Sequence, residues 1–437
     1  MSGLRAKRWH MIKAGVSIID ITPPPGLKMA GFGARIAPAT GAHDPLTVRA
    51  LSVGDTALVT VDVIGLDHKI CRRIRRRCCL PNENIIIHAT HTHGGPASMP
   101  GRLGLPSDSD FLEFLEAACV KAIDESVERQ QCSVLSFAEG DDPDIARNRR
   151  HPDGPVDRSL PIFKVRGDDG QMLAVLVNYA CHPVVLGADN NLWTSDYPHF
   201  VRDELSKTYP GASILFLTGC VGDLNTGHSA QASLSLQARD ERTFKAAHAI
   251  GRRIADNVRN ASERPLGMWA ESLEGHVSLS FERREKQDPT DLIQIWEGEL
   301  ESAGPVRSTL LKIWINWAKE VAPLQLTALK ERVSVLDWGG MQIVGMPGEI
   351  FAETALYIRA HSATDCLMLA GFCEDNPGYI PPISEYESGG YEVDEAHRYY
   401  GQPASFVCGS AELIMHKMIS ISAKLEKSVR SVKRLDD

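Results

Sequence analysis

The stretch IIIHATHTHGGP, residues 85–96, combines three branched apolar residues with two histidines that stand two positions apart. Such an apolar run is typical of a strand buried on both faces, and side chains two apart on a strand point the same way. We therefore expect His91 and His93 to emerge together where the strand ends. Paired imidazoles at a strand end often hold a divalent metal, because each offers a neutral nitrogen. A hydrogen-bonded histidine pair in a loop is the alternative that this stretch leaves open.

Length, charge and cysteine spacing restrict the kinds of function that the chain can have. A chain of 437 residues can bury a large core, and its 47 basic and 56 acidic residues give a net charge of −9. This charge gives no support to general nucleic-acid binding. The basic run at 72–77 is more typical of a solvated helix face than of a phosphate site. Ten cysteines without CxxC spacing indicate reduced thiols.

The N-terminus has no apolar stretch of signal-peptide length, and no later run reaches the roughly 18 to 20 residues that a membrane span needs. We therefore expect a soluble, cytoplasmic protein without integral membrane association. A homo-oligomer is compatible with the sequence.

Apolar runs of strand length alternate with amphipathic helical patterns, without internal repeats. This alternation predicts an α/β fold with a mixed, largely parallel sheet core flanked by helices. Strands are expected at 57–64, 84–90, 172–181, 213–218, 332–344 (a hairpin turning at Gly339-Gly340) and 366–371. Helices are expected at 110–129, 196–208, 241–260, 349–361 and 411–425.

Residues 288–321 form an exception within what we expect to be one catalytic domain over 1–437. Trp296, Trp314 and Trp317 lie in two helical stretches that Gly304-Pro305 separates, which predicts an inserted helical hairpin. The hairpin either packs on the body through its tryptophans, which we favour, or forms a lid or apolar wall over a substrate.

Three polar residues follow apolar strands: His182 after 173–181, Asp223 after 214–218, and Glu349 after 343–348. Open α/β sheets build ligand sites at the carboxyl ends of their strands. Together with the first histidine pair, these residues suggest a His/His/Glu metal site with an open position for water. A metal in such a site lowers the pKa of bound water to about 7 and polarises a carbonyl, as cleavage of an amide or ester requires.

Short motifs also occur in a characteristic order: AGV (14–16), DITP (20–23), MAGF (29–32), THTHGGP (90–96), NYACHP (178–183), SDY (195–197), GD (222–223), PGE (347–349), YIP (379–381) and GYE (390–392). In this order they resemble the neutral ceramidase family of zinc-dependent amidases, over about residues 12–392. The resemblance implies four zinc ligands: His91, His182, Glu349 and Tyr379.

The resemblance also implies the remaining roles. His93 stands beside the metal, and Arg149 and Tyr391 match an arginine and a second tyrosine of the family. In the implied mechanism, metal-activated water attacks the amide carbonyl of an N-acyl substrate while these three residues stabilise the oxyanion. His93 or Tyr391 serves as proton donor to the leaving amine.

Two departures from the family pattern affect the expected reaction. Asn225 occupies the position of a family serine, and a carboxamide cannot act as an alkoxide nucleophile, so we expect Asn225 to hydrogen-bond substrate. Asp223 is expected to orient backbone rather than bind metal. The chain ends soon after Tyr391, so we expect a short, bacterial-type member without the immunoglobulin-like domain. A soluble N-acyl compound of the cell interior is then at least as suitable a substrate as ceramide.

The sequence thus predicts a zinc-dependent hydrolase that cleaves the C–N bond of a linear amide in a small-molecule or lipid-like N-acyl substrate. A metal-dependent esterase, lactonase or phosphoesterase is an alternative, although no second carboxylate-rich strand end supports paired ions. A non-catalytic binding protein on the same fold is a further alternative, which the retained histidines, Glu349 and tyrosines disfavour.

Overall fold

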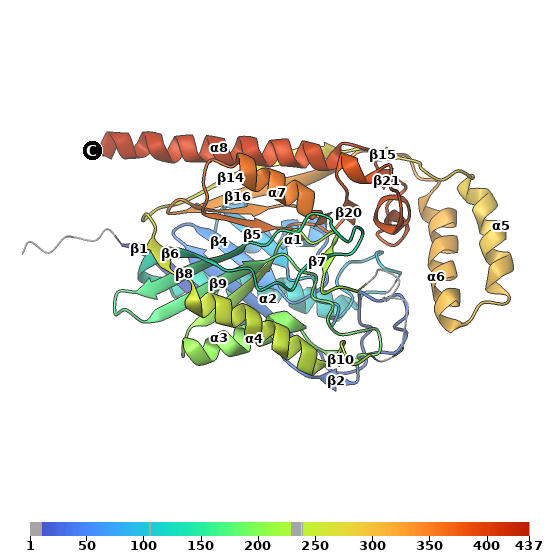
Figure 1. Cartoon of the computed structure of the whole chain (residues 1–437), viewed down its shortest axis with the longest axis horizontal. Coiled ribbons are helices and arrows are strands. Elements are labelled where there is room, and N and C mark those ends of the chain that lie inside the picture. The colour runs from blue at the N-terminus through green and yellow to red at the C-terminus, as the bar shows by residue number, and fades with distance from the viewer. Residues whose placement is uncertain (1–10, 105, 229–236, 238, 437) are drawn as a thin grey trace, which may run out of the picture.

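Two β-sheets pack face to face, and helices cover the outer face of each sheet (Figure 1). The structure is a computed structural model that describes residues 11–104, 106–228, 237 and 239–436. The α-helices are α1 (His68–Arg77), α2 (Ser109–Glu128), α3 (Tyr197–Thr208), α4 (Phe244–Asn260), α5 (Pro289–Leu300), α6 (Pro305–Asn316), α7 (Ala352–His361) and α8 (Ser410–Asp436).

The larger sheet has the strand order β11-β9-β8-β6-β1-β3-β4-β5, with β13 paired to β6. Only β9 with β11 and β4 with β5 run parallel among its described pairs. Its strands are β1 (Ile12–Asp20), β3 (Thr47–Val53), β4 (Thr56–Val61), β5 (Ile85–Ala89), β6 (Gln131–Gly140), β8 (Leu160–Gly167), β9 (Met172–Tyr179), β11 (Ser213–Thr218) and β13 (Glu263–Pro265).

The smaller sheet has the order β14-β16-β17-β19, with β14 (Ala270–Leu279), β16 (Leu329–Trp338), β17 (Met341–Gly345) and β19 (Leu367–Ala370). The turn between β16 and β17 falls at Gly339 and Gly340, as predicted. Both residues have positive φ, 68° and 99°, a conformation that glycine adopts without steric cost.

Short elements complete the chain and lie mainly in the connections. They are β2 (Gly41–Ala42), β7 (Arg147–Asn148), β10 (Leu192–Trp193), β12 (Leu224–Asn225), β15 (Phe281–Glu282), β18 (Glu349–Ile350), β20 (Tyr379–Ile380), β21 (Ser405–Phe406), η1 (Asn82–Asn84), η3 (Trp317–Val321), η4 (Ile383–Glu385), η5 (Tyr391–Glu395) and η6 (Ala396–Arg398).

Alternation along the strands divides the core into separate apolar layers. Ile86 of β5 and Leu58 of β4 point between the two sheets, while Ile87 and Val59 point toward α1 and α2. Helices α3 and α4 cover β8, β9 and β11, and α7 and α8 cover the smaller sheet. Because central strands are buried on both faces, their sequences are continuous apolar runs.

The predicted α/β class, with a mixed sheet flanked by helices, is confirmed. Parallel pairing is less extensive than expected, because β1, β3, β6, β8, β14 and β16 join antiparallel neighbours. The sequence at 288–321 forms the helices α5 and α6, which stand at one end of the molecule (Figure 1). Among the described residues, no helix is both long and apolar enough to cross a membrane.

Candidate metal centre

Three imidazoles converge at the end of the larger sheet. Ligand nitrogens of His91, His93 and His182 all lie within 4.8 Å of one another. The Oε2 atom of Glu349 lies 3.1 Å from Nε2 of His182 and 3.7 Å from Nε2 of His91. The structure therefore brings together three of the four predicted ligands, with His93 beside them.

Backbone carbonyls orient two of these rings. The Nδ1 atom of His91 lies 2.6 Å from the carbonyl of Ile64, and Nδ1 of His182 lies 2.9 Å from the carbonyl of Leu224. A carbonyl only accepts, so each Nδ1 donates a proton to its carbonyl, and Nε2 is the nitrogen that faces Glu349 in both rings. Metal-bound histidines characteristically have such a second hydrogen bond.

His93 differs from the other two histidines. Its Nε2 lies 3.4 Å from Nε2 of His91, but its Nδ1 is buried without a hydrogen-bond partner among the described residues. Gly31 approaches the ring so closely that a Cβ on this glycine would lie 2.5 Å from Cγ of His93. The glycine, whose φ is 108°, thus makes room for the imidazole.

The local backbone differs from the predicted extended strand. Strand β5 ends at Ala89, and His91 adopts a left-handed conformation with φ of 64°. The expectation that strand alternation aligns His91 with His93 is therefore wrong, although the two rings do meet. Residues other than glycine in this conformation cost about 1–3 kcal/mol, and such strain concentrates at functional sites.

Glu349 and Tyr379 are register partners in the parallel pair β18 and β20. This pairing joins two predicted ligands that lie thirty residues apart in the chain. Glu349 is fully buried, and its Oε1 accepts a short hydrogen bond from the hydroxyl of Tyr400. Burial alone raises the pKa of this carboxyl, but the two imidazoles and the Tyr400 hydroxyl bring it down to about 2. Glu349 is thus ionised over the whole neutral range.

Burial favours the neutral form of two of the imidazoles, those of His91 and His93. Burial lowers the pKa of His91 to about 4, because the charged form loses its hydration. Burial also lowers the pKa of His93 well below the ordinary value. Neutral nitrogens are the form that a metal ligand requires.

Arg149 follows β7, and its side chain lies against the ring of Tyr379. Its guanidinium carbon is 5.4 Å from the centre of the Tyr379 ring, and its Nε donates to Glu392 over 3.0 Å. Burial lowers the pKa of Arg149, but the Tyr379 phenol and the Glu392 carboxylate raise it by more than burial lowers it. The net shift of the pKa is therefore upward. The residue therefore presents a permanent positive charge beside the tyrosine.

A cluster of phenols surrounds this position. Ring centres of Tyr379 lie 5.7 Å from Tyr391 and 6.1 Å from Tyr400. Burial raises the pKa of Tyr391 and of Tyr400 well above the ordinary value, so both hydroxyls keep their protons. Sequence reasoning missed Tyr400, because it lies in an irregular segment where no apolar period marks which side chains face inward.

The side chain of Asn225 builds the turn in which it lies. Its Oδ1 accepts from the backbone N–H groups of Gly227 and His228, and its Nδ2 donates to the carbonyl of His228. Asp223 orients backbone, as predicted, since its Oδ1 accepts from the N–H of Ala352 at the start of α7. Burial raises the pKa of Asp223 to about 6.

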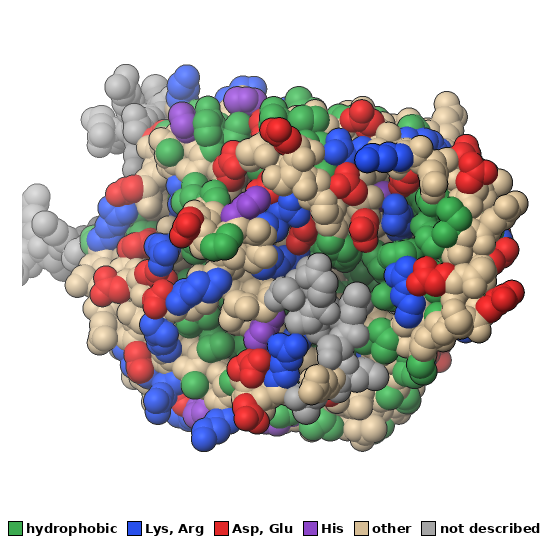
Figure 2. Space-filling model, turned by 45° about the vertical axis from the view of Figure 1, so that its right-hand side comes forward, with side chains coloured by type: hydrophobic (Ala, Val, Ile, Leu, Met, Phe, Trp, Pro, Cys, Tyr) green, Lys and Arg blue, Asp and Glu red, His purple; other side chains and the backbone are tan. Residues whose placement is uncertain are grey.

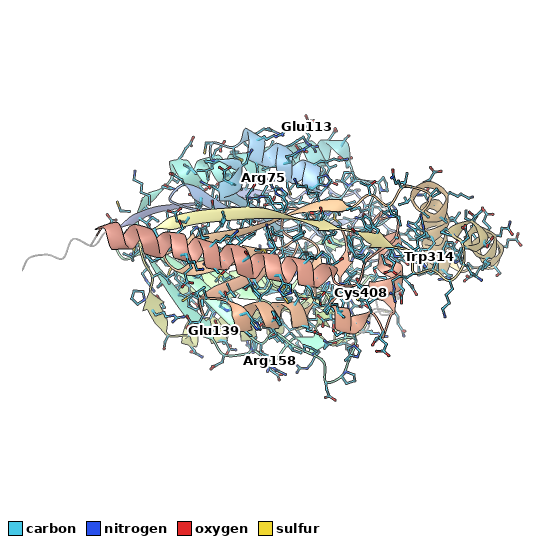
Figure 3. All side chains as sticks on the ribbon, turned by 90° about the horizontal axis from the view of Figure 1, so that it is seen from above. Arg75, Glu113, Glu139, Arg158, Trp314 and Cys408 are labelled. Carbon is cyan, nitrogen blue, oxygen red and sulfur yellow. The ribbon has the colours of Figure 1, made fainter. Side chains whose placement is uncertain are left out.

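A cavity of about 590 Å³ opens onto the imidazoles, Arg149, Asn225, Tyr379 and Tyr391. Leu310, Ile313 and Trp314 of α6 line its far side, and Figure 2 shows apolar side chains around the hollow between the hairpin and the body. Trp314 lies on the hairpin helix at this end of the molecule (Figure 3). Trp317 also anchors the hairpin, because its Nε1 donates to the carbonyl of Gln402 over 2.8 Å. The hairpin thus both packs on the body and lines the cavity.

The chain resembles known ceramidases in sequence and in fold. No family model matches the chain. The neutral ceramidase of Drosophila melanogaster is 25% identical over 229 residues, which are 45% of this chain and 32% of the fly protein. The match therefore spans about a third of that relative's length.

Two solved structures share the fold. One, of a ceramidase complexed with C2, superposes with a TM-score of 0.72 at 14% identity, covering 96% of this chain and 76% of the other. The second, of the neutral ceramidase from Pseudomonas aeruginosa, gives a TM-score of 0.71 at 14% identity and covers 96% and 75% of the two chains.

Proposed function

We propose that the chain is a member of the neutral ceramidase family and a zinc-dependent amidohydrolase that cleaves the C–N bond of a linear N-acyl substrate. The observation that carries this proposal is the convergence of His91, His182 and Glu349, with each Nδ1 satisfied and each Nε2 facing the carboxylate. The proposal extends to a cytoplasmic location and to a single catalytic domain over 1–437 with the hairpin at 288–321 inserted in it.

The donor set fits a zinc ion. Two imidazoles, a carboxylate and a phenol are ligands that zinc accepts, and the cavity that these residues line would give water and substrate access to the ion. We assign the ligands to His91, His182, Glu349 and Tyr379. A zinc ion in this position activates water and polarises the scissile carbonyl.

The remaining residues act on the substrate. Arg149 and Tyr391 line the cavity with a permanent cation and a protonated phenol, which are suited to stabilise the oxyanion of the tetrahedral intermediate. His93 lines the same cavity, and its Nδ1 has no hydrogen-bond partner within the part of the chain that the structure describes, which supports a role in proton transfer to the leaving amine rather than metal binding.

Asn225 is proposed to contact the substrate from the cavity wall. The Asn225 side chain is already hydrogen-bonded within its own turn. Its amide group would therefore meet the substrate in a fixed position on the cavity wall. Such fixed groups contribute to binding because little conformational freedom is lost when substrate arrives.

The first test is elemental analysis of the purified wild type, of His182→Ala and of His248→Ala. His248 lies on the surface of α4 and is the matched control, with a side chain 45% exposed. We expect near-stoichiometric zinc and amide hydrolysis in the wild type and the control, and loss of both in His182→Ala. A wild type that binds no zinc when the metal is supplied contradicts the proposal.

A further inference from the structure

Helix α6 is the helix of the hairpin that lies nearer to the body, and it carries two apolar stripes (Figure 1). Leu311 and Ile315 face α5, where they pack with Trp296 in a core that belongs to the hairpin alone. The other stripe faces the body, and its members recur at steps of three and four residues: Val306, Leu310, Ile313 and Trp314. Side chains at these steps lie on one side of a helix. One side of α6 thus completes the hairpin, and another covers the cavity.

The first turn of α6 meets the body beside the proposed catalytic residues. Val306 packs against the apolar cluster that contains Phe32 and Val184. The Phe32 ring centre lies 4.8 Å from that of His93, and Phe32, Val184 and His93 all line the cavity. This end of α6 therefore lies next to the place where the proposed function puts the scissile bond.

Farther along, α6 touches the body again, at Gly104. A Cβ built on this glycine would lie 2.5 Å from Cδ1 of Ile313, so the isoleucine side chain rests directly against the glycine. The neighbouring Leu103 is held in place, because its N–H donates to the carbonyl of Tyr399 over 2.5 Å. Ile313, Gly104 and Leu103 all line the cavity. Their contact closes the space between hairpin and body at this point.

An aromatic wall extends from Tyr391 to α6. The ring centre of Tyr399 lies 6.0 Å from that of Tyr391 and 6.4 Å from that of Trp314, and all three rings line the cavity. Arg307 of α6 also lines it, but its guanidinium carbon lies 4.7 Å from the Trp314 ring centre and its Nε lies 2.6 Å from Oε1 of Glu299. The surface beneath α6 is therefore mainly apolar and aromatic, which favours a hydrocarbon group over a polar one.

We propose that the acyl half of the substrate is a hydrocarbon chain that binds beneath α6, and that Ile313, resting on Gly104, limits its length. This inference rests on the proposed amidohydrolase function. Ile313 lies seven positions after Val306, which is about 10 Å at the rise per residue of an α-helix. A zigzag chain of about eight carbons spans this distance, since each bond of about 1.5 Å advances it by a little less than its own length. The substrate class is thus an N-acyl amide with an acyl chain of medium length.

The test measures kcat/KM of the zinc-loaded enzyme for N-octanoylethanolamine and N-myristoylethanolamine, below the concentrations at which they aggregate. These two amides share one amine and differ only in acyl length. We expect kcat/KM for the octanoyl amide to exceed that for the myristoyl amide at least tenfold, because the longer chain meets the contact of Ile313 with Gly104.

Changes at Ile313 should move the preferred length in opposite directions. Ile313→Ala opens the contact and should raise the ratio of myristoyl to octanoyl kcat/KM at least fivefold. Ile313→Phe fills more of the space and should favour N-hexanoylethanolamine over the octanoyl amide. Ile295→Ala, the same substitution on α5 at a side chain that is 51% exposed, is the matched control and should keep the wild-type order.

The comparison of lengths separates specificity from stability of the hairpin. An unchanged ratio in folded, active Ile313→Ala overturns the inference and leaves the amidohydrolase standing. A fall in kcat/KM that is equal for both lengths assigns Ile313 to holding the hairpin and overturns it as well. If Ile313→Ala does not fold, the smaller change Ile313→Val tests the same contact and should raise the ratio at least twofold.

A failure to hydrolyse any of these amides contradicts the proposed function itself. Calorimetric binding of octanoate and myristate, the acids that these amides would release, then decides on the acyl site separately. We expect the wild type to bind octanoate more tightly than myristate, and Ile313→Ala to shift this preference toward myristate. An affinity ratio that is the same in the wild type and in Ile313→Ala overturns the site.

Discussion

The space between the two sheets and the metal centre are both buried, yet they are built in opposite ways. Between the sheets, Leu58, Ile86 and Leu336 alternate regularly with residues that face the helices. At the metal centre, two imidazoles meet an ionised carboxylate, and the backbone of His91 is strained. The first region contributes stability through burial of apolar surface, whereas the second retains polar groups at a cost that only function explains.

The largest expected effect separates His91 from His93. His91→Ala should lose zinc and reduce amide hydrolysis by more than about 100-fold. Removing a metal ligand should cost more activity than the roughly 10–100-fold that follows when a hydrogen-bond partner of a ligand is removed. His93→Ala should keep zinc and reduce hydrolysis by roughly 100-fold or more, as expected for a proton-transfer residue. Metal analysis and steady-state kinetics on the same preparations measure both. Zinc loss in His93→Ala instead makes His93 a ligand.

Between the sheets, the corresponding change is Ile86→Ala. It removes a fully buried side chain and should lower the free energy of unfolding by about 2–5 kcal/mol. Urea denaturation of the zinc-free protein measures this, with Ile18→Ala as the control because Ile18 is 40% exposed. The folded fraction of Ile86→Ala should bind zinc like the wild type, and weakened zinc affinity in that fraction would couple the two regions.

This contrast also explains what the sequence could predict. The apolar runs of β5, β9, β11 and β17 identified strands of the two sheets, and His182 and Glu349 were placed correctly after β9 and β17, because burial and strand termini leave local patterns. The left-handed turn at His91 and the contact of Tyr400 with Glu349 leave no such pattern. They depend on loops that are distant in sequence and meet only in the folded chain.

A smaller effect is expected at Tyr400, which holds one oxygen of Glu349 and leaves the other toward the histidines. Tyr400→Phe should weaken zinc binding by about 10–100-fold while the fold is kept, because partners of metal ligands contribute about this much. Chelator competition measures the dissociation constant. Tyr399→Phe is the control, and equal zinc affinity in the wild type and Tyr400→Phe would show that Glu349 is positioned without this hydroxyl.

The smallest effect belongs to charges at the edge of the larger sheet. Glu263 of β13 accepts hydrogen bonds from Arg166 and Lys164 of β8. The hydrogen bond from Arg166 is the main cause that brings the pKa of Glu263 down to about 2, against the opposing effect of burial. A carboxyl whose pKa is lower in the folded state stabilises the protein above its ordinary pKa of about 4.5, and loses this contribution as the pH falls through about 2.

Because the Glu263 side chain is partly exposed to solvent, its contribution should be below about 1 kcal/mol and should shrink with added salt. Glu263→Gln should therefore be slightly less stable than the wild type at pH 6, and the difference should diminish as the pH falls from about 5 toward 2. Glu113→Gln, on the outer face of α2 (Figure 3), is the control and should match the wild type throughout. A difference between Glu263→Gln and wild type that is independent of pH would assign the effect to packing rather than charge.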